Sequence, residues 1–171
     1  MSHRLFTHKN SRCFTPHGHN EYVKAHLIST AHRPLDGTGN MIAPFALLKE
    51  RWHQWIDNHV DHSLHLSGQD QMLDYFKSTE PETLAHIMVT PGDPTTEILA
   101  ACFMSKINAL LDDQNIGVRC RKIEVMETPT NSVIFRGDPA EVICRDHYAG
   151  PAIPWWQRAD MSINDLDREE T

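Results

Sequence analysis

The sequence predicts an α+β domain in which two helices lie on one face of an antiparallel sheet. Three observations lead to this fold class. The elements follow one another as strand, helix, helix and hairpin, both helices have one apolar side, and 171 residues suit one domain with a sizeable core. Because an antiparallel sheet commonly buries only one face, helices layered on that face complete such a domain.

The first strand and the turn after it are read from local composition. Residues 17–28 have the β-branched and aromatic content of a strand. Residues 34–39, Pro-Leu-Asp-Gly-Thr-Gly, then end it with side chains typical of turns.

Two helices are predicted from apolar residues at helical spacing. The first begins with Pro44, because proline suits the first helical position. Its apolar stripe consists of Phe45, Leu48, Trp52, Trp55, Ile56 and His59. The second runs from Thr95 or Thr96 to about Leu111, and its buried face consists of Leu99, Phe103, Ile107 and Leu110.

A hairpin and a C-terminal extension complete the chain. Residues 119–128 and 132–135 are predicted strands around the turn Pro129-Thr130-Asn131. We place the domain at 1–138 and an extension at 139–171. Because Trp155 and Trp156 are costly to leave in water, the extension is expected to pack on the domain or a neighbouring subunit, with its last residues flexible.

The most informative stretch is Cys13-Phe14-Thr15-Pro16-His17-Gly18-His19-Asn20. Two histidines two apart on a strand project to the same face, so both imidazoles can reach one metal ion. Neutral imidazole suits zinc, and a catalytic zinc keeps one position open after three protein ligands. A third ligand is therefore needed, and the thiol of Cys13 can meet a substrate held beside the metal.

Further motifs occur in a fixed order along the chain. They are His3-Arg4-Leu5, Cys13-x-x-x-His17-Gly18-His19-Asn20, Thr38-Gly39-Asn40-Met41-Ile42, Val60-Asp61-His62, Pro94-Thr95-Thr96-Glu97 and Val125-Met126-Glu127-Thr128. Together they resemble the 6-pyruvoyltetrahydropterin synthase and 6-carboxytetrahydropterin synthase family over residues 3 to 138. The ordered set is far more specific than any single motif.

The resemblance implies a role for each matching residue. The implied zinc ligands are His3, His17 and His19. The implied catalytic set is Cys13, Asp61 and His62, in which Asp61 orients His62 for proton transfer. Glu127 is expected to grip the pterin ring through a bidentate contact, with Thr95, Thr96 and Glu97 as further substrate-binding residues.

Several alternatives stay open at this point. His8 or Cys13 could supply the third metal ligand in place of His3, and His65 is a spare candidate beside His62. Thr95, Thr96 and Glu97 could form only a helix cap with an acidic first turn. The chain also departs from the family pattern, with Pro44 in place of an acid and Glu21 in place of an aromatic residue.

The resemblance implies a zinc-dependent lyase of the tunnelling-fold type acting on 7,8-dihydroneopterin triphosphate. The tight Cys-x-x-x-His-Gly-His spacing favours 6-carboxytetrahydropterin as the product, a step towards 7-deazaguanine and queuosine. The other product of the family is 6-pyruvoyltetrahydropterin. A paralogue acting on a related pterin, or a metal- or pterin-binding protein without enzyme activity, are the rival hypotheses.

Composition and topology indicate the setting and the partners. A net charge of −7 argues against nucleic acid as a direct partner. No apolar run approaches a membrane span and no leader opens the chain, so we expect a cytoplasmic protein with reduced cysteines. Unpaired sheet edges favour a symmetric homo-oligomer. The resemblance implies a barrel-forming trimer that pairs into a hexamer, with Glu127 serving a zinc site that a neighbouring chain helps to build.

Overall fold

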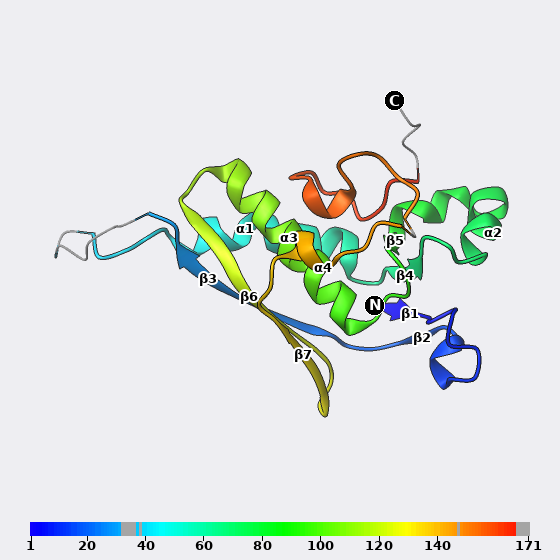
Figure 1. Ribbon diagram of the computed structural model, residues 1–171. Coiled ribbons are helices and arrows are strands. Elements are labelled where there is room, and N and C mark those ends of the chain that lie inside the picture. The colour runs from blue at the N-terminus through cyan, green and yellow to red at the C-terminus, as the bar shows by residue number, and fades with distance from the viewer. Residues whose placement is uncertain (32–36, 38, 147, 167–171) are drawn as a thin grey trace.

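The structure is a computed structural model that describes residues 1–31, 37, 39–146 and 148–166. Two small sheets flank a pair of helices, and the C-terminal segment lies over them (Figure 1). The strands are β1 (Ser2–His3), β2 (His17–Gly18), β3 (Tyr22–Ser29), β4 (Leu64–Ser67), β5 (Ile87–Thr90), β6 (Val118–Thr128) and β7 (Asn131–Phe135). The helices are α1 (Phe45–Trp55), α2 (Met72–Thr79), α3 (Thr96–Gln114) and α4 (Pro139–Val142).

An antiparallel sheet of order β3-β6-β7 carries α3 on one face, with α1 beside that helix (Figure 1). This arrangement confirms the α+β class and the hairpin, whose strands are joined through Pro129 and Thr130. It also shows the two predicted helices on the same side of the sheet. The closure of such sheets into an oligomeric barrel remains a prediction.

Helix α3 is the centre of the core, as its sequence pattern predicts. The four residues of its expected buried face, Leu99, Phe103, Ile107 and Leu110, are each at most 2% exposed. The helix begins where Thr95 Oγ1 accepts a hydrogen bond from the backbone N–H of Ile98 at 3.5 Å, a side-chain N-cap. It ends at Asn115, whose φ of 51° is the left-handed conformation common after helices.

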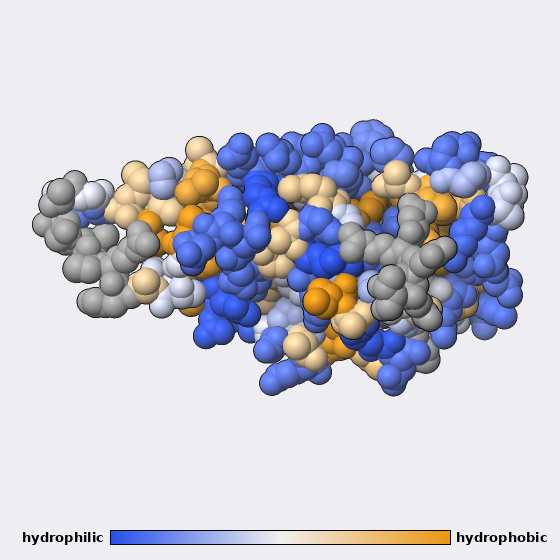
Figure 2. Space-filling model, turned by 90° about the horizontal axis from the view of Figure 1, so that it is seen from above, coloured by the Kyte–Doolittle hydropathy of each residue, from blue (hydrophilic) through white to orange (hydrophobic). Residues whose placement is uncertain are grey.

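Helix α1 differs from its prediction at its first turn. Pro44 precedes the helix with an extended ψ of 134°, so the first helical residue is Phe45. Trp52 and Trp55 are buried as expected, but Phe45 is 77% exposed. The first turn of the helix therefore lies outside the core. Phe45 instead borders an apolar groove of about 680 Å³ between β3 and α1. Hydrophobic surface is visible at this end of the molecule in Figure 2.

A second sheet, which the sequence patterns did not predict, corrects the single antiparallel sheet. Its order is β2-β1-β4-β5, with β1 antiparallel to β2 and with parallel pairs β1–β4 and β4–β5. The predicted strand 17–28 is divided between the two sheets, because His17–Gly18 pairs with β1 and Tyr22–Ser29 pairs with β6. The turn predicted at 34–39 falls mostly outside the described residues.

The described part of the C-terminal extension, residues 139–166, packs on the helices and on β5 (Figure 1). Trp155 and Trp156 are both 0% exposed. Trp155 Nε1 donates to the Val89 carbonyl at 2.7 Å, and the Val89 N–H donates to the Ile163 carbonyl at 3.2 Å. The extension therefore forms hydrogen bonds with the backbone of Val89 at the outer edge of β5. Its last residues, predicted to be flexible, lie outside the described residues.

Lys106 on α3 binds the extension through its ammonium group. Its side chain is fully buried, and Nζ donates to the Trp155 carbonyl at 3.1 Å and to Asp160 Oδ1 at 3.3 Å. Burial lowers the pKa of Lys106 to about 8, although the Asp160 carboxylate opposes this change.

Among the described residues, no helix has the length and apolar character required to cross a membrane.

We predict that Trp155→Ala lowers the free energy of unfolding by about 3–5 kcal/mol, the usual cost of deleting a buried aromatic side chain. The reason is the loss of ring contacts with Trp55 and Trp156, together with the hydrogen bond to Val89. Urea unfolding followed by circular dichroism measures the change. Ile153→Ala is the matched control, since Ile153 is 58% exposed and should change stability little. Equal effects of the two changes would contradict the packing described here.

Candidate active site and metal centre

Three histidines from the N-terminal segment form one cluster. His3 on β1 lies directly opposite His17 on β2, and His19 follows β2 with its N–H bonded to the Met1 carbonyl at 3.1 Å. One nitrogen from each ring lies within 4.8 Å of the other two. The ring centroid of His3 lies 4.6 Å from that of His17 and 5.3 Å from that of His19, and the centroids of His17 and His19 are 4.9 Å apart. The cluster therefore consists of the three residues that the resemblance implies as ligands.

Backbone carbonyls orient two of these rings. His3 Nδ1 donates to the Pro94 carbonyl at 3.1 Å, and His17 Nδ1 donates to the Thr15 carbonyl at 2.8 Å. With Nδ1 protonated in each ring, the Nε2 atoms of His3 and His17 face each other at 3.2 Å. Burial holds the pKa of His3 below its ordinary value, so its ring is neutral at pH 7. Two lone pairs at this distance repel each other unless a cation lies between them, so the donor set fits a metal ion.

The structure distinguishes between the candidates for the third ligand. His3 is inside the cluster, whereas His8 is 57% exposed and its Nδ1 bonds to Asp93 Oδ2 at 3.0 Å. Cys13 is outside the group of converging donors among the described residues. His65, the spare catalytic candidate, is fully buried on β4 opposite His3, where Nε2 contacts Ser63 Oγ at 2.8 Å. Burial lowers the pKa of His65 to about 3, so it serves as a neutral core residue.

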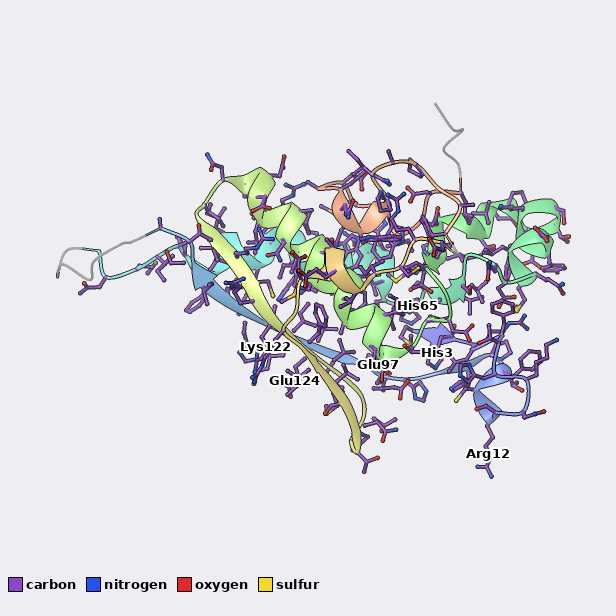
Figure 3. All side chains as sticks on the ribbon, in the orientation of Figure 1. His3, Arg12, His65, Glu97, Lys122 and Glu124 are labelled. Atoms are coloured by element: carbon purple, nitrogen blue, oxygen red, sulfur yellow. The ribbon has the colours of Figure 1, made fainter. Side chains whose placement is uncertain are left out.

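A cavity of about 470 Å³ opens beside the cluster. Its lining includes His3, Cys13 and Glu127, together with the residues at the start of α3, Thr95, Thr96 and Glu97. In Figure 3, Glu97 at the start of α3 and His3 on β1 are drawn near each other, and both line this cavity. Glu127 Oε1 is 3.8 Å from His3 Nε2, and the Glu127 side chain is 19% exposed. One cavity thus joins a thiol, a carboxylate and the rim of the metal centre.

Asp61 and His62 lie on the other side of the cluster. They border a separate shallow pocket with Met1, Gly18 and His19. His62 Nδ1 is 3.0 Å from Asp61 Oδ2, and their side chains are 90% and 58% exposed. The expected trio of Cys13, Asp61 and His62 is therefore not assembled in one pocket of a single chain. Cys13 and Glu127, by contrast, line one cavity of the same chain. The expectation that Glu127 serves a zinc site partly built by a neighbouring chain stays a prediction.

Burial also distinguishes Glu21, the residue that departs from the family pattern. Burial, together with the nearby Glu127 carboxylate, raises the pKa of Glu21 to about 7. Its Oε1 is buried without a hydrogen-bond partner in the described structure. The chain therefore places a second carboxyl group, one with a raised pKa, near the expected pterin-binding glutamate.

The sequence patterns missed three residues that hold the site. Arg4 forms a bidentate pair with Asp70, with both N–O distances at 2.6 Å, and Asp93 binds the loop after β1. Arg4 could have been suspected because it sits next to His3 in a motif. Nothing local marks Asp70 or Asp93, which lie 66 and more than 80 residues from their partners.

The fold and the three-histidine cluster beside a thiol-containing cavity fit a metal-binding pterin protein, but they do not assign a family by themselves. Sequence similarity provides that assignment. A family model described as 6-pyruvoyl tetrahydropterin synthase matches residues 1–138. The chain belongs to this family.

Curated relatives and a solved structure agree with this assignment. A protein of Rickettsia typhi (strain ATCC VR-144 / Wilmington), named 6-carboxy-5,6,7,8-tetrahydropterin synthase, is 33% identical over 122 residues, which cover 71% of this chain and 83% of that protein. A protein of Rickettsia bellii (strain RML369-C) with the same name is 30% identical, covering 74% and 86%. The crystal structure of an uncharacterized protein from Wolinella succinogenes shares the fold, with a TM-score of 0.62 and 20% identity over 80% of this chain and 92% of that one.

We predict that His17→Ala abolishes stoichiometric metal binding, because the variant removes one of three converging nitrogens. Metal content after incubation with zinc and gel filtration, measured by mass spectrometry, tests this expectation. His8→Ala is the matched control and should retain the wild-type content, since His8 bonds to Asp93 outside the cluster. If only the His8 variant loses metal, the assignment of the centre is wrong.

Proposed function

We propose that this protein is a zinc-dependent 6-carboxytetrahydropterin synthase that converts 7,8-dihydroneopterin triphosphate to 6-carboxytetrahydropterin. The observation that supports it best is the convergence of His3, His17 and His19 at the rim of a cavity that also contains Cys13 and Glu127. The names of the rickettsial relatives favour this product over 6-pyruvoyltetrahydropterin. The reaction would be a step towards 7-deazaguanine and queuosine.

Zinc is the metal we propose for the three histidines. The donors are three imidazoles, two of them fixed by carbonyls, and such a set leaves a further coordination position open. Bound zinc would supply Lewis acidity towards the side-chain oxygens of the substrate.

The remaining steps fall to side chains of the cavity. The Cys13 thiolate would accept a proton from the substrate side chain and return it as a thiol. The two oxygens of Glu127 would accept hydrogen bonds from the ring N–H and the exocyclic amine of the pterin. Thr96 and Glu97 would form the wall of the cavity at the start of α3, while Thr95 Oγ1 is already engaged as the helix cap.

Turnover of the zinc-loaded protein tests the proposal. Incubation with 7,8-dihydroneopterin triphosphate should yield 6-carboxytetrahydropterin, acetaldehyde and triphosphate, identified by mass. A 6-pyruvoyl product would assign the other activity of the family. No turnover with intact zinc binding would favour a metal- or pterin-binding protein.

We predict that Cys13→Ala lowers kcat by about 10²–10⁴-fold, the usual contribution of a proton-transfer group, while zinc remains bound. The measurements are the rate of product formation at saturating substrate and the zinc content of the same preparation. Cys144→Ala is the control because Cys144 is exposed and lies outside the cavity. Loss of zinc in the Cys13 variant would make this thiol a ligand instead.

We further propose that the active protein is a homo-oligomer, a hexamer of two trimers. β3 and β7 are the outer strands of the antiparallel sheet, and the apolar groove beside β3 offers surface that association would cover. Asp61 and His62, which are separate from Cys13 within one chain, would then complete a neighbouring chain's cavity.

Mixing of inactive chains tests this arrangement. Cys13→Ala and His62→Ala chains, each inactive alone, should regain part of the activity when refolded together, because some sites would combine an intact thiol with an intact histidine. A mixture of Cys13→Ala and Glu127→Gln chains should recover less, since those residues line one cavity of the same chain. Light scattering establishes the oligomeric state, and a monomer would contradict the proposal.

A further inference from the structure

The segment that carries Cys13 is a loop whose backbone hydrogen bonds are largely internal, among them those from the His8 N–H to the Leu5 carbonyl at 3.1 Å and from the Ser11 N–H to the His8 carbonyl at 2.8 Å. It leaves β1 after His3, makes a single turn of 3-10 helix at Arg12–Phe14, and returns through a hydrogen bond from the Leu5 N–H to the Cys13 carbonyl at 2.8 Å. Most of residues 7–12 are exposed. A loop of this kind does not fix a thiol against a metal centre unless another element holds it.

Two anchors hold this loop from outside. Arg4, which pairs with Asp70, lies over the Phe14 ring at 5.2 Å, and Asp93 binds residues 6–8. Asp93 Oδ1 accepts from the Phe6 N–H at 2.9 Å, and its Oδ2 accepts from the Thr7 N–H at 3.2 Å. The Thr7 hydroxyl also donates to Oδ2, and His8 Nδ1 lies 3.0 Å from the same atom. The Asp93 side chain is only 7% exposed, so loss of these donors would leave a largely buried carboxylate unsatisfied.

The position of Asp93 links this loop to the metal centre. The next residue, Pro94, provides the carbonyl that orients His3, and Thr95 caps α3. A single turn between β5 and α3 therefore holds a metal ligand by its backbone and the thiol-bearing loop by a side chain. The relative position of the two groups depends on that turn.

The contacts of the turn show that its two tasks are separable. The Thr95 N–H donates to the Asp93 carbonyl at 2.8 Å, and the Thr95 cap also fixes the turn without using the Asp93 carboxylate. Replacing the carboxylate should therefore release the loop while the Pro94 carbonyl stays in place. His3 is independently paired between β2 and β4.

We propose that Asp93 is a positioning residue that holds the Cys13 loop at the correct distance from the three-histidine centre. The proposal rests on the proposed function only in its kinetic consequence. An asparagine at this position has the same shape but presents an amide N–H₂ in place of one oxygen, so it cannot accept from both Phe6 and Thr7. Asp93→Asn is therefore the sharpest variant, and Thr7→Val removes one donor more mildly.

The test uses the protein with four readouts, of which the melting temperature reports on overall stability. Lys9 and Arg12 are exposed trypsin sites within the loop, so the initial rate of cleavage there measures release of the loop without requiring turnover. Zinc affinity, measured by competition with a chelating dye, reports on the histidine cluster. Steady-state kinetics separate kcat from KM. Asp74→Asn is the matched control, an exposed acid on α2 outside the site.

For Asp93→Asn we expect cleavage in the loop to rise about tenfold, as expected when a net stabilisation of roughly 1.4 kcal/mol is lost. Zinc affinity should stay within about threefold of wild type, since the His3 anchor is unchanged. kcat should fall on the order of 10²-fold with KM little changed, the effect of displacing a reacting group by about 1 Å. Thr7→Val should shift cleavage and kcat in the same direction by less.

Three results would overturn the proposal. One is unchanged trypsin cleavage in Asp93→Asn, and another is faster cleavage with wild-type kcat. The third is a parallel loss of zinc affinity and melting temperature, which would make Asp93 a general stabilising residue. If the wild-type protein turns over no pterin, the proposed function fails, but cleavage and zinc affinity still decide whether Asp93 holds the loop independently of the metal centre.

Discussion

The hydrogen bond from His3 Nδ1 to the Pro94 carbonyl joins the two halves of the site. His3 is 2% exposed on the central strand of the mixed sheet, between β2 and β4, so its ring has little freedom. The bond commits Nδ1 as a donor and leaves Nε2 facing His17. Because Pro94 opens the segment that caps α3, the longest buried helix sets the position of the three-histidine cluster. Loss of this contact would uncouple the N-terminal histidines from the cavity wall at Thr96 and Glu97.

The C-terminal extension stabilises the same connection from the opposite side. Val89 on β5 exchanges hydrogen bonds with Trp155 and Ile163 of the extension, and Asn164 Nδ2 donates to the Leu84 and Ile87 carbonyls at 2.8 Å and 2.7 Å. β5 leads directly into the turn that contains Asp93 and Pro94. An edge strand of four residues is a weak support by itself. Hydrogen bonds and buried indole rings at its outer edge strengthen that support, although the described part of the extension contributes no side chain to the cavity.

The sequence could predict the elements whose patterns are long enough to show a period. α3, the hairpin of β6 and β7, and the burial of Trp52 and Trp55 follow from helical or alternating spacing. The mixed sheet could not be predicted in this way, because its strands have only two or four residues. Phe45 shows a second limit: it fits the helical stripe of α1 but lies beyond the edge of the core, where periodicity gives no information.

The same distinction applies to the candidate site. Motifs placed His3, His17 and His19 in one set, and the structure brings the three rings together. The residues that fix the loop and the ring of His3 were not predicted, because Asp70, Asp93 and Pro94 act through contacts across most of the domain. Their effect depends on tertiary geometry, and their side chains are common types with no distinctive spacing.

The geometry of His62 gives a physical reason to look beyond the single chain. Its φ of 61° lies in the left-handed region, which is uncommon for residues other than glycine, although histidine adopts it more often than most side chains. Its contacts within the chain offer little in return, because the pair with Asp61 is exposed and such pairs contribute little to stability. Strain that the fold does not relieve occurs preferentially at functional positions. The exposed acid–histidine pair beside His19 therefore supports our proposal that these two side chains complete the cavity of a neighbouring chain.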